Sequence, residues 1–225
     1  MPQKMQTRIY PMADADLKQL ADQLKTSIVR DATDFATRNI AAAQLTAYQT
    51  TINVFDATTT DEELLGLVTD AVEKRDAIVE NSQKAIRTIR NMAEITYNSK
   101  GKYATFGFDD LSKLTPNDLY RLATRVVRVG NQLLAELSAQ GLTAAQLTAL
   151  GTLATQLDNA IDFVAEKIEI RDLETQDRVI KGNLLWAEMS RLASIGKSLF
   201  EDTNEAKYND YVLVGSSTPP TPPVG

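Results

Sequence analysis

The feature that most limits the fold of this chain is an internal similarity between its two halves. Sliding the sequence by 102 positions aligns Asp16–Thr50 with Asp118–Thr152 and gives 11 identities in 35 positions. Six of these identities form one unbroken run, in which Ala42–Ala47 falls on Ala144–Ala149. Fixed internal repeats indicate a chain built from repeated structural units, so the sequence predicts two tandem repeats.

The repeats suggest a division of the chain into four parts. The similarity weakens after the aligned region and returns near the end of each half, where Lys102-Tyr103 resembles Lys207-Tyr208. We therefore predict an N-terminal arm at 1–13, helical repeats at 14–110 and 111–214, and a Pro-rich tail at 215–225. The tail contains four prolines in its last seven residues, which is typical of a solvated, polyproline-like segment.

Both repeats begin with apolar residues at helical spacing. Apolar side chains recur every three or four positions from Leu17 to Ile28 and from Leu119 to Leu137, as on one face of a helix. Asp14 is a helix-capping residue before the first series, and Thr115-Pro116 precedes the second, whose helix is expected to end at Gly141. Further helices are expected to start at Asn39 and at Thr143.

The second repeat continues its apolar pattern from Leu147 to Leu199, interrupted by the charged stretch Glu169–Arg178. This stretch is either a hairpin turn or a polar layer in one long helix, and the absence of Gly and Pro favours the continuous helix. The first repeat breaks at Ala57–Thr60, after which a new helix begins. Whether the long helices bend at 75–82 and 171–178 is left open. The predicted fold is all-α, an elongated helical bundle built from two tandem repeats of two to three helices each.

Strand signals are confined to two short segments, Lys102–Phe108 and Tyr208–Val214, which either pair or lie extended on the bundle. Aromatic residues gather in and beside both segments. Such side chains either anchor loops onto the ends of the bundle or form a surface that binds a partner. The candidate interface aromatics are Tyr103, Phe106, Phe108, Tyr208 and Tyr211.

Basic residues are concentrated in the middle of the chain. Residues 84–128 have a net charge of +5, whereas residues 1–83 and 129–225 have net charges of −5 and −6. Helical spacing places these cations in two stripes. The candidate contacts for an anionic partner are Lys84, Arg87, Arg90, Arg121, Arg125 and Arg128. A basic stripe either neutralises a polyanion or is a solvated face that pairs with acidic neighbours. A basic middle with acidic ends would also attract other copies of the protein.

The composition excludes much catalytic chemistry, because the chain has neither Cys nor His. Thiolate sites, His-ligated zinc and Ser-His-Asp triads are therefore impossible. The segment Ser99–Lys102 lacks the spacing of a phosphate-binding loop. We expect no catalytic residue, no bound metal and no cofactor, and we interpret the chain as a non-enzyme. A weaker alternative is a small-molecule or catalytic site around the polar residues in the middle of the long helices: Arg75, Ser82, Arg171 and Arg178.

No secretory signal and no run of about 18 apolar residues occurs, so a cytoplasmic protein without a membrane span is expected. Incorporation into a larger particle and export by a signal-free route stay open. The favoured function is a non-enzymatic structural scaffold, a homo-oligomer that self-associates through helical faces and terminal arms. The alternative is a helical binding module for an anionic partner, nucleic acid or acidic protein, through the central basic patch. Nucleic acid is the less favoured partner.

Overall fold

The computed structural model describes residues 6–108 and 110–213, and every regular element within these ranges is a helix. This confirms the all-α fold class. The α-helices are α1 (Asp14–Arg30), α2 (Ala32–Ala36), α3 (Ala42–Asp56), α4 (Asp61–Tyr97), α5 (Pro116–Gln132), α6 (Leu134–Leu137), α7 (Ala144–Phe200) and α8 (Glu205–Asp210). Short 3-10 helices are η1 (Gly101–Phe106), η2 (Leu111–Lys113) and η3 (Ser138–Gln140). The predicted Pro-rich tail, 215–225, lies outside the described residues.

The described parts of the two segments predicted to be extended contain helical turns and no strand, so the strand interpretation was wrong. The first contains all of η1 except Gly101, and the second contains the last three residues of α8. At the second segment the side chain of Asn204 accepts a hydrogen bond from the backbone N–H of Lys207 at 3.0 Å, which caps α8. A capped turn satisfies backbone donors locally, and the aromatic side chains still reach the core from it.

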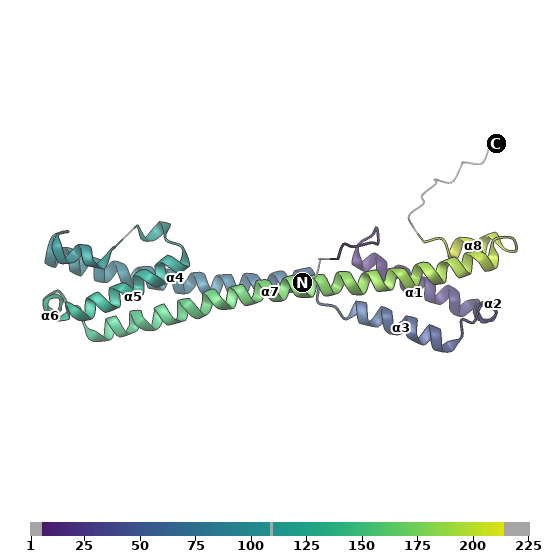
Figure 1. Cartoon of the computed structure of the whole chain (residues 1–225), viewed down its shortest axis with the longest axis horizontal. Helices are drawn as coiled ribbons and strands as arrows, with labels where there is room; N and C mark the ends of the chain where they lie inside the picture. The colour runs from purple at the N-terminus through teal and green to yellow at the C-terminus, as the bar shows by residue number, and fades with distance from the viewer. Residues whose placement is uncertain (1–5, 109, 214–225) are drawn as a thin grey trace, which may run out of the picture. The chain divides into compact units, whose positions relative to one another are not determined.

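Helix α7 is a single element of 57 residues, drawn as one unbroken ribbon in Figure 1. It passes through the charged stretch Glu169–Arg178 without a break, which confirms the prediction of a continuous helix. Its start is fixed by a capping box, in which the Thr143 hydroxyl accepts from the Gln146 N–H and the Gln146 side chain accepts from the Thr143 N–H. In the described part of the chain, no helix combines the length and the apolar character needed to span a membrane.

Two predicted helix boundaries differ from the structure. The helix expected at Asn39 begins at Ala42, because Asn39 has a left-handed φ of 60° that a helix cannot include. The helix after Thr115 ends at Gln132 instead of Gly141, and α6 and η3 form a corner in between. The cap at Thr115 is as expected, since its hydroxyl accepts a hydrogen bond from the Asp118 N–H at 3.2 Å.

The chain divides into two compact units. Unit 1 comprises 1–60 and 172–225, and unit 2 comprises 61–171. In unit 1, α1 and α3 pack against the C-terminal part of α7. Its core contains Leu17, Leu24, Ile28, Phe35, Tyr48, Ile52, Leu185, Met189, Leu192 and Tyr211. Trp186, the only tryptophan, packs against this core.

Unit 2 is built in a similar way from α5 and the two long helices. The C-terminal part of α4 and the N-terminal part of α7 supply most of the remaining core side chains. This core contains Ile86, Ile89, Ala93, Phe106, Leu111, Leu119, Leu122, Val126, Leu147, Leu150 and Leu157. Because α7 contributes to both cores, each unit contains helices from both predicted repeats.

The unit boundaries therefore differ from the predicted repeat boundaries, whereas the helix positions keep the offset of the sequence alignment. Helices α1 and α5 each have 17 residues and begin at Asp14 and Pro116. Helices α3 and α7 begin at Ala42 and Ala144, which is the same offset of 102 positions. The duplication itself stays a prediction.

Ser82 is a polar residue at a fully buried position of α4. Its hydroxyl has no hydrogen-bond partner among the described residues. A buried hydroxyl without a partner costs about 1–3 kcal/mol. We therefore expect Ser82→Ala to raise the free energy of unfolding by about 1 kcal/mol, measured by urea denaturation followed by circular dichroism. A lower stability of the alanine variant would show that the hydroxyl is bonded in solution.

Candidate anion-binding surface

Helix α5 separates an apolar face from a basic one. Leu119, Leu122 and Val126 are buried in the core of unit 2, at three- and four-residue spacing. Exposed positions of the same helix carry the arginines Arg121, Arg125 and Arg128. The buried face thus holds the helix in place, and the same periodicity sends the three guanidinium groups to solvent.

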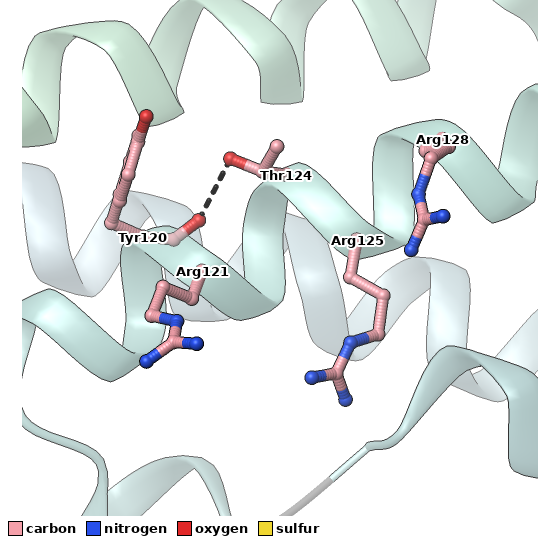
Figure 2. Close-up of a pocket in the computed structure, with 5 residues that line it drawn as sticks. All are labelled: Tyr120, Arg121, Thr124, Arg125 and Arg128. Atoms are coloured by element: carbon pink, nitrogen blue, oxygen red, sulfur yellow. Dashed lines mark hydrogen bonds between the residues drawn. The ribbon is translucent and has the colours of Figure 1, made fainter.

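The three arginines line one hollow in the surface of unit 2. The hollow has a volume of about 230 Å³, and Tyr120 and Thr124 complete its lining. Figure 2 shows the three guanidinium groups on the same side of α5. The Thr124 hydroxyl donates to the Tyr120 backbone carbonyl at 3.0 Å. The lining therefore combines three cations with the half-buried Tyr120.

These three cations differ from Lys102 and Lys113 of the same unit, which are each paired with an acidic residue. Lys113 lies 3.0 Å from a carboxylate oxygen of Asp110, and Lys102 is paired with Glu136. Among residues 6–108 and 110–213, none of the three hollow arginines forms an ion pair. Their charge is thus not neutralised by an ion pair within the described part of the molecule.

Arg125 is positioned by its contact with Gly107. The guanidinium of Arg125 occupies the space in which the side chain of any other residue at position 107 would begin. Gly107 also has a φ of 62°, in the left-handed region that favours glycine. Glycine is thus favoured at this position by its conformation, and a side chain there would displace the end of the Arg125 side chain.

The second predicted stripe, on α4, does not line this hollow. Lys84 and Arg87 are exposed, and Arg87 donates a hydrogen bond to the Gln83 side chain at 3.0 Å. Arg90 is half-buried, and its charge helps to lower the pKa of Asp110, after the hydrogen bonds from Ser112 and Lys113. The structure thus gathers the three α5 arginines at one hollow and leaves the three α4 cations outside it.

Two of the five predicted interface aromatics are core residues, and the other three are partly buried against the two cores. Phe106 and Tyr211 are fully buried, so these two cannot form an exposed binding surface. Phe106 stacks on Phe108 with ring centroids 4.9 Å apart, and Tyr103 contacts Phe108 at 5.4 Å. Tyr208 packs against the core of unit 1. Phe106 and Tyr211 thus anchor the segments after α4 and α7 onto their own cores, whereas for the three partly buried aromatics both sequence interpretations stay predictions.

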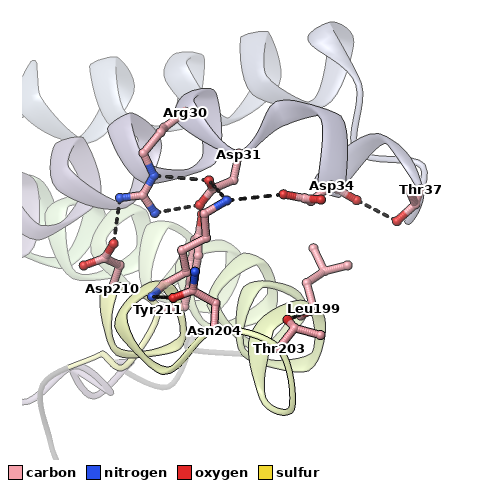
Figure 3. Close-up of polar contacts among 10 residues, drawn as sticks. Arg30, Asp31, Asp34, Thr37, Leu199, Thr203, Asn204, Asp210 and Tyr211 are labelled. Atoms are coloured by element: carbon pink, nitrogen blue, oxygen red, sulfur yellow. Dashed lines mark hydrogen bonds and ion pairs between the residues drawn. The ribbon is translucent and has the colours of Figure 1, made fainter.

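A second polar cluster, in unit 1, surrounds the carboxylate of Asp31 at the corner between α1 and α2 (Figure 3). The Asp31 side chain is 1% exposed and accepts hydrogen bonds from three residues. Arg30 donates at 2.6 Å and 3.2 Å, Lys207 lies at 2.7 Å, and the Tyr211 hydroxyl donates at 2.8 Å. Arg30 also contacts Asp210 at 2.7 Å.

The electrostatics of this cluster favour the ionised carboxylate. Hydrogen bonds from Arg30, with those from Lys207 and Tyr211, hold the pKa of Asp31 well below its ordinary value of 3.8, against the opposing effect of burial. Burial and the bond to Asp31 raise the pKa of Tyr211. Because every oxygen of Asp31 is engaged within the chain, the cluster joins α8 to the α1–α2 corner. The sequence carried no signal for it, since Asp31 and Tyr211 are 180 residues apart.

The residues of the predicted polar mid-section have separate surroundings. Arg178 is buried in unit 1, where its Nη1 donates to the Thr59 carbonyl at 2.7 Å and its Nε lies 3.0 Å from Asp14. In unit 2, Arg75 contacts Asp76 at 2.7 Å, Ser82 is buried, and Arg171 is half-buried. Arg178 thus connects α7 to the beginning of α1 and to the linker before α4.

In comparisons with known proteins, no family model matches the chain, and no curated protein or solved structure is detectably similar to it. Within the described ranges, no three acidic side chains gather closely enough to hold a metal ion.

Proposed function

We propose that the protein is a non-enzymatic helical binding module that holds an anionic partner on α5. The single observation that carries the proposal is the hollow at which Arg121, Arg125 and Arg128 meet without an acidic partner among the described residues. Guanidinium groups donate to phosphate and carboxylate oxygens in a planar, bidentate geometry, so the three side chains suit a partner with several such groups.

The spacing of the arginines favours an extended polyanion over one small ion. From Arg121 to Arg128 the helix rises by about 10 Å, at 1.5 Å per residue. Three cations distributed over this length match a chain of repeated anionic groups, either nucleic acid or an acidic stretch of protein. Affinity from such contacts falls as salt rises, because each neutralised phosphate releases bound counterions.

Replacing all three arginines by glutamine is expected to abolish most of this binding. We expect R121Q/R125Q/R128Q to bind heparin, as a model polyanion, at least about tenfold more weakly at 0.1 M salt, and to show a smaller salt dependence. The measurement is fluorescence anisotropy of labelled heparin at several salt concentrations. Single-stranded and double-stranded nucleic acids, tested in parallel, would identify the class of polyanion.

A matched control removes the same net charge elsewhere. Lys74, Lys181 and Arg191 are each paired with an acidic residue of their own helix. The variant K74Q/K181Q/R191Q should keep wild-type heparin affinity within about twofold, because exposed paired cations contribute little to attraction. Equal losses in the two triple variants would mean that only net charge matters, and the proposed site would be wrong.

A second proposal is the structural scaffold that self-associates as a homo-oligomer. The observation that favours it is the N-terminal segment, residues 6–13, whose first residues are held on the surface of α7 by side-chain hydrogen bonds. A segment held in this way is suited to exchange between copies. Light scattering across a range of concentrations tests the proposal, and a constant monomer mass would contradict it.

We further propose that the fold is an elongated bundle of two tandem repeats that exchange their third helices. The support is a correspondence of core positions in α4 and α7. Ile86, Ile89 and Ala93 of unit 2 have the same spacing as Met189, Leu192 and Gly196 of unit 1. An experimental structure in which these positions do not superimpose would overturn this proposal.

A further inference from the structure

The N-terminal segment lies on α7 in the manner of a bound peptide. Asn183 of α7 contacts its backbone twice, accepting from the Ile9 N–H at 2.9 Å and donating to the Thr7 carbonyl at 3.0 Å. Gln176 repeats this arrangement, accepting from the Gln6 N–H at 3.2 Å and donating to the Gln6 carbonyl at 3.4 Å. Both side chains are primary amides, which offer one acceptor and one donor group to a peptide backbone.

The spacing of the two amides matches an extended peptide. Gln176 and Asn183 are seven residues apart, which is about 10.5 Å along a helix. The backbone groups that they bind, at Gln6 and Ile9, are three residues apart, which is about 10 Å in an extended chain. The two amides of α7 therefore bind the backbone of the segment, and their contacts depend on the spacing of backbone groups and not on which side chains the segment carries.

A single side chain supplies the anchor of the segment. Tyr10 is 3% exposed, and its ring lies directly against Gly182, at a distance that leaves no room for a side chain at position 182. The Tyr10 hydroxyl donates to Asp14 at 2.8 Å, and its ring packs edge-on against Phe55. By contrast, residues 6–9 are all exposed.

We propose that the Gln176–Gly182–Asn183 surface of α7 is a binding site for an extended peptide, and that its partner is the N-terminal segment of a second copy. Every copy carries both the segment and the site, so an exchange would form the same hydrogen bonds between chains as within one. This inference rests on the second proposal above, self-association, and it specifies the residues through which copies join.

The chain's own N-terminal segment competes with that of a second copy for the site, so exchange depends on protein concentration. A segment tethered next to its own site has an effective concentration in the millimolar range. Binding within one chain therefore predominates in dilute solution, and exchange between chains becomes comparable as the protein approaches that range. A scaffold that is already concentrated in an assembly meets this condition.

Two complementary full-length variants remove the competition. In the donor, Q176A/G182A/N183A, both amides and the space for the Tyr10 ring are lost, so the N-terminal segment is released. In the acceptor, Tyr10→Ala, the site is intact and the anchor of the segment is lost. A second acceptor, Ile9→Pro, removes the backbone N–H that donates a hydrogen bond to Asn183. It keeps Tyr10, in case the loss of this buried side chain impairs folding. Circular dichroism confirms that each variant is folded.

The readout is mass by sedimentation equilibrium at concentrations up to about 1 mM. Each variant alone should have the mass of a monomer, and an equimolar mixture of donor and acceptor should approach twice that mass. A mixture that stays monomeric overturns the inference. If the separate variants self-associate as the wild type does, copies join through another surface, so the scaffold proposal holds and the exchange is wrong.

Discussion

Replacing the buried Asp31 by asparagine should lower the free energy of unfolding by about 3 kcal/mol, because the carboxylate accepts charged hydrogen bonds that an amide cannot replace. Asparagine also brings an N–H₂ group toward Arg30 and Lys207, which are themselves donors. The measurement is urea denaturation of D31N and wild type followed by the fluorescence of Trp186, which packs against the core of unit 1.

Asp34 provides the control, since it is half-exposed and lies 3.5 Å from the same lysine. Asp34→Asn should cost less than about 1 kcal/mol, as is usual for exposed ion pairs. If D31N were as stable as D34N, the cluster would contribute nothing to the attachment of α8.

The pH dependence follows from the lowered pKa of Asp31. The unfolded chain takes up this proton near the ordinary pKa of 3.8, and the folded chain only at lower pH. Stability from the ionised carboxylate is therefore fully present above that ordinary value and is lost as pH falls through the lowered folded pKa. The stability gap between wild type and D31N should stay constant above about pH 5 and narrow below about pH 4.

The second large effect is expected at Gly196, where α7 passes the ring of Tyr211. A side chain at position 196 would overlap the ring atoms of this fully buried tyrosine. Gly196→Ala must displace the ring, and with it the hydroxyl that donates to Asp31. We expect a net loss of about 2–3 kcal/mol, in spite of the gain in helix propensity. Thermal unfolding followed by circular dichroism measures it.

Gly151 lies in the same helix and serves as the matched control. No atom lies within 4 Å of the position that its side chain would occupy. Gly151→Ala should therefore raise stability by up to about 1 kcal/mol, the usual difference in helix propensity. A stabilising effect of alanine at both positions would show that Tyr211 moves without cost.

The helices were predictable because their signals are local. The cap at Thr115 and the absence of Gly and Pro from the charged stretch of α7 are both local signals, and the structure has both the cap and the continuous helix. The corner after Gln132 was not predicted, because the apolar pattern continues through it. Likewise, aromatic residues at 106 and 211 suggest strands locally, whereas burial against distant helices decides their conformation.

The candidate site could be predicted only in part. Helical spacing correctly places Arg121, Arg125 and Arg128 on one exposed face of α5. It cannot show that Lys84 lies outside their hollow, because that depends on how α4 and α5 pack. The N-terminal segment and its site on α7 are about 170 residues apart in sequence. Contacts at such separation leave no periodic signal.

The nesting of unit 2 between the two parts of unit 1 affects the order in which the protein folds during its synthesis. Residues 61–171 emerge from the ribosome as one continuous stretch that contains a complete unit. The hairpin of α1 and α3 is made first, but its partner side chains, Leu185 to Tyr211, follow more than a hundred residues later. At a synthesis rate of about 5–20 residues per second, the apolar faces of α1 and α3 stay without these partners for about ten seconds. The unit that begins first is therefore the last to be completed.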